Sequence, residues 1–142
     1  MMFLGEYAHT IDTKGRLTIP SKFRDALSRG VVITRGFSKN LVAYPIQEWA
    51  ALAEKIRSKP VSDQKMMNFR RRLFSGAADL TPDKQGRVLI PNNLRAFAQL
   101  ENDVMIVGNF DFLEIWQADA WEAERGLIEG EDAAAMWDNL GI

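Results

Sequence analysis

Aspartate and arginine recur in one fixed arrangement at two places in the chain. Asp12 and Arg16 stand four residues apart, as do Asp83 and Arg87, and a glycine precedes each arginine. Asp-x-x-Gly is typical of a tight turn between two antiparallel strands. An arginine beside such a turn can donate two hydrogen bonds to guanine O6 and N7 in the DNA major groove. The alternative interpretation is a solvated arginine that forms an ion pair with the aspartate of its own turn.

Both turns are therefore candidate DNA contacts. The predicted DNA-binding residues occupy the tips and closing positions of the turns: Thr13, Lys14, Gly15, Arg16, Lys84, Gln85, Gly86 and Arg87. We expect Arg16 to read guanine, with Arg87 as the second reader, and the two lysines to contact phosphates or base edges. The glycines permit the tight turn and a close approach of the backbone. Asp12 and Asp83 are expected to hold the turns and to orient the arginine side chains.

These motifs belong to a longer internal repeat. Residues 10–27 match residues 81–98 at an offset of 71, and the match continues at an offset of 72, from Val32 and Val104 to Trp49 and Trp121. A duplicated unit of about half the chain indicates two similar halves that build one structure together. Near-matching turns in both halves also favour DNA contact over two coincidental surface ion pairs.

Each half is predicted to contain short strands interleaved with small helices, which is the pattern of an α+β fold. Strands are expected at residues 3–11, 16–19, 31–34, 41–44, 77–80, 87–90, 104–107 and 113–116. Helices are expected at residues 21–28, 45–57, 62–74, 91–98, 118–124 and 130–140. Since chains of about 60 residues are marginally stable alone, we expect the halves to interlock into one pseudo-symmetric β-barrel-like core. The helices at 45–57 and 62–74 form a hairpin that joins the halves.

Charge is unevenly divided along the chain, although the formal net charge is only −1. Residues 1–75 hold 14 Lys and Arg against 6 Asp and Glu, whereas residues 76–142 hold 4 against 13. Such asymmetry points to nucleic acid or to head-to-tail self-association. A bipolar surface without a partner is the alternative. Within the cluster Arg70-Arg71-Arg72, three neighbours on a helix cannot share one face, so at least one is expected to pack against protein.

Several classes of function find no support in the residues. The chain has no cysteine, and His9 is its only histidine, so neither thiolate chemistry nor the usual zinc site is available. Asp79 and Asp83 are close in sequence, but no nucleophile, base or phosphate loop accompanies them. No apolar run approaches the ~18 residues of a membrane helix. We predict a soluble intracellular protein that is not an enzyme and needs no metal or cofactor.

The segments DTKGRLTIP and DKQGRVLIP, with the opening GEYAHTIDTKGRLTIPSKFR, resemble the MraZ family of bacterial regulators. That family carries two Asp-x-x-x-Arg motifs on tandem SpoVT/AbrB-like half-domains, and the resemblance covers essentially the whole chain. It implies a swapped-hairpin β-barrel of the double-psi, AbrB-like type. Residues 1–75 would be the first half with the linker helices, and residues 76–142 the second half with a C-terminal helix.

The resemblance also implies a function. It implies a sequence-specific DNA-binding transcriptional regulator that represses its own division and cell-wall operon from G-rich direct repeats in double-stranded DNA. The protein would act in the cytoplasm, at the nucleoid, as a homo-oligomeric ring of eight or more subunits with no membrane partner. The second turn is less basic than the first, with Gln85 where the first has Lys14.

A rival interpretation is an antitoxin-like module on the AbrB fold that binds a protein partner through a tail. The acidic stretch 129–138 could be such a tail. Against this interpretation, the stretch is short, and Trp137 and Leu140 in this region indicate that it docks rather than extends as a free tail.

Overall fold

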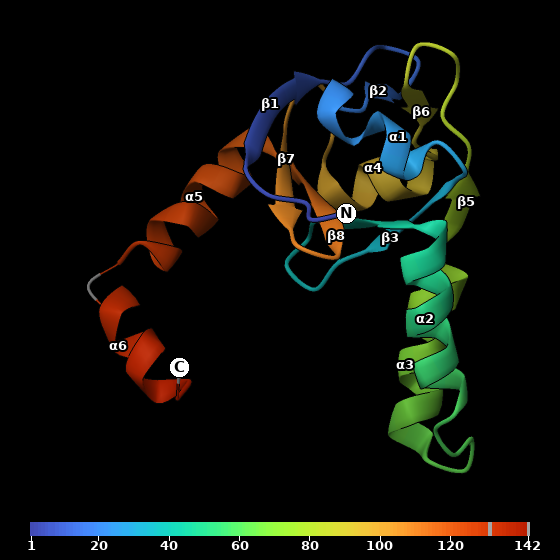
Figure 1. Ribbon diagram of the computed structural model, residues 1–142, viewed down its shortest axis with the longest axis vertical. Coiled ribbons are helices and arrows are strands. Elements are labelled where there is room, and N and C mark those ends of the chain that lie inside the picture. The colour runs from blue at the N-terminus through green and yellow to red at the C-terminus, as the bar shows by residue number, and fades with distance from the viewer. Residues whose placement is uncertain (131, 142) are drawn as a thin grey trace.

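Six antiparallel strands form the central sheet of the protein, which a computed structural model describes for residues 1–130 and 132–141 (Figure 1). In sheet order they are β1 (Glu6–Thr10), β7 (Asp103–Asn109), β8 (Phe112–Gln117), β4 (Leu41–Pro45), β3 (Val31–Arg35) and β5 (Ala78–Leu80). Strand β1 of the first half pairs with β7 of the second, and β5 of the second half pairs with β3 of the first. Each half therefore adds its first strand to the hairpin of the other, and the repeat gives the sheet an approximate two-fold symmetry about β4 and β8.

A separate two-stranded ribbon joins the two motif copies directly. It consists of β2 (Arg16–Thr18) and β6 (Arg87–Leu89), which run antiparallel. Leu17 lies opposite Val88 at its centre, and both side chains are buried. Because strand side chains alternate between faces, the remaining four residues of the ribbon lie on its outer side.

Small helices cover the core between the sheet and the ribbon. These are a 3₁₀ turn, η1 (Ser21–Phe23), with α1 (Arg24–Leu27) in the first half, and α4 (Asn92–Ala98) in the second. Phe23 is fully buried, and its ring meets Phe3 and Tyr7 edge-on at centroid distances of 5.1 and 5.3 Å. The prolines that precede η1 and α4 hold extended backbone, so each helix starts directly after its ribbon strand.

A helical hairpin projects from one end of the sheet body. It is formed by α2 (Ile46–Arg57) and α3 (Gln64–Ser75), as the sequence predicts. Arg72 fastens α3 to the body, since its Nη2 donates to the Gly36 carbonyl at 2.7 Å and its guanidinium lies 4.4 Å from the Phe37 ring centroid. The prediction that one arginine of residues 70–72 packs against protein is confirmed.

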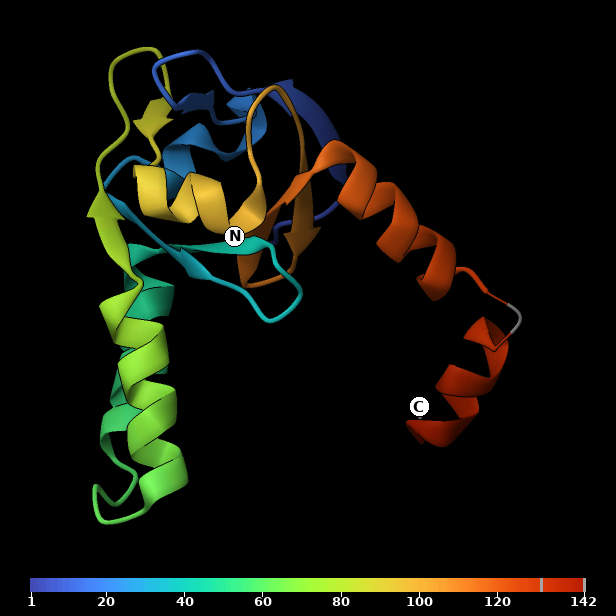
Figure 2. The same ribbon diagram turned by 180° about the vertical axis from the view of Figure 1, so that it is seen from behind.

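The chain ends in a second extension, the C-terminal arm, which comprises α5 (Ala118–Ile128) and α6 (Ala133–Asn139). Trp121 anchors α5, since its Nε1 donates to Glu6 Oε1 at 2.7 Å and its ring packs on buried Trp116. Two opposite views place the arm and the α2–α3 hairpin on opposite sides of the sheet body (Figures 1 and 2). Glu131, within the predicted acidic tail, lies outside the described residues.

The predicted mixed α+β fold is confirmed. The expected closed β-barrel is not observed in the described residues, where the sheet is open. A closed barrel needs every strand to pair on both sides, and among the described residues the outer strands β1 and β5 do not pair with each other. The motif strands, three residues each, form the β2–β6 ribbon instead of closing the sheet. Helix α5 runs four residues beyond its predicted end at 124 and continues through Gly126. None of the helices in the described part is long and apolar enough to cross a membrane.

The ribbon centre is expected to be a main source of stability. Leu17→Ala should lower the free energy of unfolding by about 3 kcal/mol, because it leaves a cavity between the halves. Leu89→Ala is the matched control, since Leu89 lies on the opposite face of the same ribbon with 57% of its surface exposed, and should change stability by less than about 0.5 kcal/mol. Urea unfolding followed by tryptophan fluorescence measures both, and equal effects would contradict this account of the core.

Candidate nucleic-acid interface

The first Asp–Arg turn is closed by its aspartate. Asp12 Oδ1 accepts from the backbone N–H groups of Lys14 at 3.0 Å and Arg16 at 2.8 Å. The Asp12 carbonyl accepts from the N–H of Gly15 at 3.0 Å, and the Asp12 N–H donates to the Arg16 carbonyl at 3.0 Å. Gly15 has a φ of +87°, which explains why glycine stands there.

The second turn repeats this geometry. Asp83 Oδ1 accepts from the N–H groups of Gln85 and Arg87, both at 2.9 Å. The Asp83 carbonyl accepts from Gly86 at 2.9 Å, and Gly86 has a φ of +75°. The duplication seen in the sequence is therefore a duplication of hydrogen-bond pattern.

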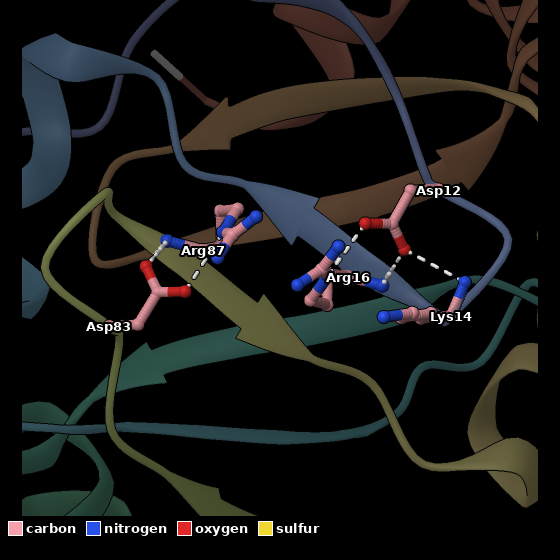
Figure 3. Close-up of polar contacts among 5 residues, drawn as sticks. All are labelled: Asp12, Lys14, Arg16, Asp83 and Arg87. Atoms are coloured by element: carbon pink, nitrogen blue, oxygen red, sulfur yellow. Dashed lines mark hydrogen bonds and ion pairs between the residues drawn. The ribbon is translucent and has the colours of Figure 1, made fainter.

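Each aspartate also orients its arginine. Arg16 Nε donates to Asp12 Oδ2 at 2.7 Å, and Arg87 Nε donates to Asp83 Oδ2 at 2.8 Å (Figure 3). The two arginine side chains keep 32% and 29% of their surface exposed. Within residues 1–130 and 132–141, nothing accepts a hydrogen bond from the terminal guanidinium nitrogens of either arginine. Both guanidinium groups are thus held in place through Nε, and their terminal nitrogens remain available as hydrogen-bond donors.

The turn hydrogen bonds keep both aspartates ionised. The backbone N–H of Arg16 is the largest cause that lowers the pKa of Asp12, and the Arg16 side chain lowers it further. The backbone N–H of Arg87, followed by its side chain, lowers the pKa of Asp83 in the same way. A charged carboxylate is the better acceptor for a guanidinium. Both aspartate–arginine Nε contacts, called the clamps below, are therefore intact at neutral pH.

The two arginines lie on one face of the β2–β6 ribbon. Arg16 pairs with Leu89, and Thr18 pairs with Arg87. All four are therefore on the face opposite buried Leu17, and the arginines are diagonal neighbours with Cα atoms about 7–8 Å apart. In Figure 3 the two guanidiniums lie between the two aspartates, above the paired strands.

An arginine and a backbone N–H group of the second half support the first turn, and this support is called the brace below. A Cβ atom at Gly15 would lie 2.5 Å from Cζ of Arg95, so the guanidinium of Arg95 rests directly on the turn glycine. Arg95 Nε donates to the carbonyl of Ile90 at 2.9 Å, and the Ile90 N–H donates to the Gly15 carbonyl at 2.9 Å. Two groups of the second half, the Arg95 guanidinium and the Ile90 N–H, therefore contact the first turn directly.

The first half braces the second turn in the reciprocal way. Arg24 lies over Gly86, Arg24 Nε donates to the Ile19 carbonyl at 3.3 Å, and the Ile19 N–H donates to the Gly86 carbonyl at 2.8 Å. No role was predicted for Arg24 and Arg95 from the sequence. Their recurrence at the offset of 71 was the signal that could have found them.

The remaining predicted DNA-binding residues lie at the exposed tips of the turns. Thr13 and Lys14 form one tip, and Lys84 and Gln85 form the other. Both tips flank the arginine face, because each turn leads directly into its ribbon strand. The structure thus brings all the predicted site residues to one end of the molecule, and their contact with DNA stays a prediction.

These features define a class of duplicated α+β proteins in which two aspartate-clamped arginines share an outer β-ribbon. Within this class the chain belongs to the MraZ family, since residues 2–72 and 73–129 each match the family described as "MraZ protein, putative antitoxin-like".

Curated relatives resemble the chain over most of its length. A protein of Roseiflexus sp. (strain RS-1) is 54% identical over 134 residues, which cover 94% of this chain and 92% of the relative. One of Herpetosiphon aurantiacus is 50% identical over 121 residues, 85% of each chain. One of Acetivibrio thermocellus is 47% identical over 143 residues, 99% of this chain and all of the relative. Each of the three is named "Transcriptional regulator MraZ".

The clamps predict how the two aspartates titrate. In a carboxyl ¹³C NMR titration, the midpoints of Asp12 and Asp83 should fall below the ordinary value of 3.8. A lowered pKa means that these carboxylates stabilise the fold above pH 3.8, and that this contribution is lost as the pH falls through the folded-state pKa. Arg16→Ala keeps the backbone N–H, so the Asp12 midpoint should rise but stay below 3.8. Wild-type midpoints at or above 3.8 would contradict the clamp.

The brace predicts that Gly15 cannot be replaced. Gly15→Ala should lower the free energy of unfolding by about 1–2 kcal/mol from the left-handed backbone alone, and it should also displace Arg95. Gly126→Ala is the control, because Gly126 lies in α5 with nothing within 4 Å of its Cβ position, and it should stabilise the protein by up to about 1 kcal/mol. Thermal unfolding at one protein concentration compares them. A neutral Gly15→Ala would show that the turn does not depend on the brace.

Proposed function

We propose that the protein is a transcriptional regulator that binds double-stranded DNA through the outer face of the β2–β6 ribbon. The observation that carries this proposal is that Arg16 and Arg87 lie on one outer face of the ribbon with their Nε atoms bound to aspartate and, among the described residues, no acceptor for their terminal nitrogens. The names of the curated relatives support a role in transcription.

The geometry suits readout of guanine. A two-stranded ribbon fits the DNA major groove, where an arginine can donate to guanine O6 and N7. The aspartate clamp fixes each side chain before binding, so less conformational entropy is lost on contact. Lys14 and Lys84, at the exposed tips, would contact flanking phosphates and set the register. No catalytic step and no cofactor enter this mechanism.

Repeated operator sites would supply affinity that one subunit lacks. In line with the family resemblance, we propose a ring of eight or more subunits that binds G-rich direct repeats and represses its own division and cell-wall operon. Simultaneous contacts raise the effective concentration of each further contact. The exchange of β1 and β5 between the halves supports the view that they act as the two subunits of a swapped-hairpin, AbrB-type unit. Such a regulator would work in the cytoplasm, at the nucleoid.

An antitoxin-like role is the second candidate. The description of the matching family and the exposed, acidic C-terminal arm favour it. In that case the protein would be a protein-interaction module whose arm binds a toxin.

Fluorescence anisotropy with G-rich direct-repeat DNA and a scrambled duplex, over a salt series, tests the first proposal. Repeat-specific binding should weaken as salt rises, because phosphate contacts release counterions. Arg16→Ala should weaken binding by about 10- to 100-fold or more per guanine contact, equivalent to about 1–3 kcal/mol. Arg87→Ala should have a similar or smaller effect, and the oligomer should persist in both variants.

Arg29→Ala is the matched control, since Arg29 is exposed at the hairpin end of the body and should leave repeat-specific binding unchanged. Equal binding to both duplexes would reduce the ribbon to a non-specific basic surface. Binding to neither, together with co-purification of a stoichiometric toxin, would favour the antitoxin-like role. Loss of the oligomer in Arg16→Ala would overturn its assignment as a reading residue.

A further inference from the structure

Helix α6 presents an apolar stripe that the described structure leaves uncovered. Ala133, Met136, Trp137 and Leu140 are spaced at i, i+3, i+4 and i+7, so they lie on one side of the helix. Trp137 is 63% exposed, and none of residues 133–139 is buried. With Ile128 of α5 the stripe lines a hollow of about 330 Å³.

A short helix of this kind needs a partner. Isolated helices of fewer than about 12–15 residues are marginal in water, and most helices in proteins are stabilised by packing of their apolar face. Helix α6 has seven residues and buries none of them in its own chain. A tryptophan at the centre of an exposed stripe is also the residue type that most often anchors a protein interface.

An aromatic groove lies elsewhere on the molecule, between the α2–α3 hairpin and the sheet. Its volume is about 310 Å³, and its aromatic lining consists of Phe37, Tyr44, Phe69 and Phe112. Phe37 stacks on Phe69 at a centroid distance of 6.1 Å, and Tyr44 stacks on Phe112 at 4.8 Å. Phe37 nevertheless keeps 72% of its surface exposed. The groove is therefore formed already and suits an apolar side chain of another segment.

Charge makes the arm and the hairpin complementary. Residues 118–142 contain seven Asp and Glu against one Arg, whereas residues 57–72, from the end of α2 through most of α3, contain six Lys and Arg against one Asp. Opposite net charges favour encounter and exclude the pairing of two arms or two hairpins. Arg72, whose guanidinium covers Phe37, places one of these cations at the groove itself.

The arm of the same copy does not occupy this groove. Both views show the arm and the hairpin extending from opposite sides of the sheet body (Figures 1 and 2). An arm that lies away from its own groove leaves that groove open to the arm of a neighbour. Contacts between two different surfaces of identical subunits are head-to-tail, and they generate rings when the rotation closes.

We propose that the C-terminal arm of one copy docks the α6 stripe, with Trp137 as its anchor, into the aromatic groove of the next copy. This inference rests on the proposed ring and names the contact that would build it. It follows the helix-in-groove mode, in which residues at i, i+3, i+4 and i+7 enter an apolar groove. The acidic residues of the arm would then face the cations of the neighbouring hairpin.

Because the natural chain has no cysteine, disulfide cross-linking of the full-length protein tests the contact. Ser38→Cys at the groove rim and Asn139→Cys beside the stripe are combined in one chain, since both residues are exposed. Oxidation should yield a ladder of covalent multimers on a non-reducing gel. The matched control replaces Ser38→Cys with Ser21→Cys, an exposed serine of η1 near the ribbon. The ladder should exceed the control at least about tenfold, because docking raises the effective concentration of the paired thiols.

Adding Trp137→Ala to the double variant should reduce the ladder to the control level, while circular dichroism shows that the fold is retained. A cross-linked monomer would overturn the inference by placing the arm in its own groove, and no cross-link above the control would overturn it as well. Anisotropy of the reduced double variant separates this inference from the proposed function. Repeat-specific DNA binding without a ladder would refute only the docking, and a ladder without DNA binding would refute only the DNA-binding function.

Discussion

The pairing of β2 with β6 is the constraint on which the rest of the structure depends. Leu17 and Val88 bury the inner side of this ribbon, and the same pairing places a turn of each half within reach of the other half's arginine brace. Neither turn is complete without groups from the opposite half, so the two halves fold as one unit. A single half would lose its braces, its exchanged strand and much of its core at once.

The aspartates connect this architecture to the proposed chemistry. One carboxylate oxygen closes the turn through backbone N–H groups, and the other holds the arginine Nε. An intramolecular ion pair and a DNA-reading arginine are often treated as alternatives, but here they are compatible, because the pair engages Nε and leaves the terminal nitrogens available. The clamp therefore prepares the side chain for binding without occupying the donors that guanine would need.

The two copies of the motif are alike in framework and different in surface. The turn hydrogen bonds match within 0.1 Å, whereas the exposed positions differ, with Lys14 against Gln85 and Thr18 against Leu89. The extensions differ more strongly, since the first half ends in a basic hairpin and the second in an acidic arm. Duplication thus supplies a shared outer face with two arginines, while divergence gives one chain two unlike ends, as the proposed head-to-tail assembly would require.

The sequence by itself determined the repeat, the α+β class and the Asp–Arg turns, and it placed most strands and helices within a few residues. Each of these features depends on local rules of hydrophobic period, turn residues and helix breakers. The sequence also indicated that at least one arginine of residues 70–72 packs against the protein or a neighbouring subunit. Tertiary structure decided that β1 and β5 exchange between halves, that the sheet stays open, and that Arg24 and Arg95 brace opposite turns. These features join residues between 45 and about 100 positions apart, and a local pattern carries no information about which distant backbone groups will supply the missing hydrogen bonds.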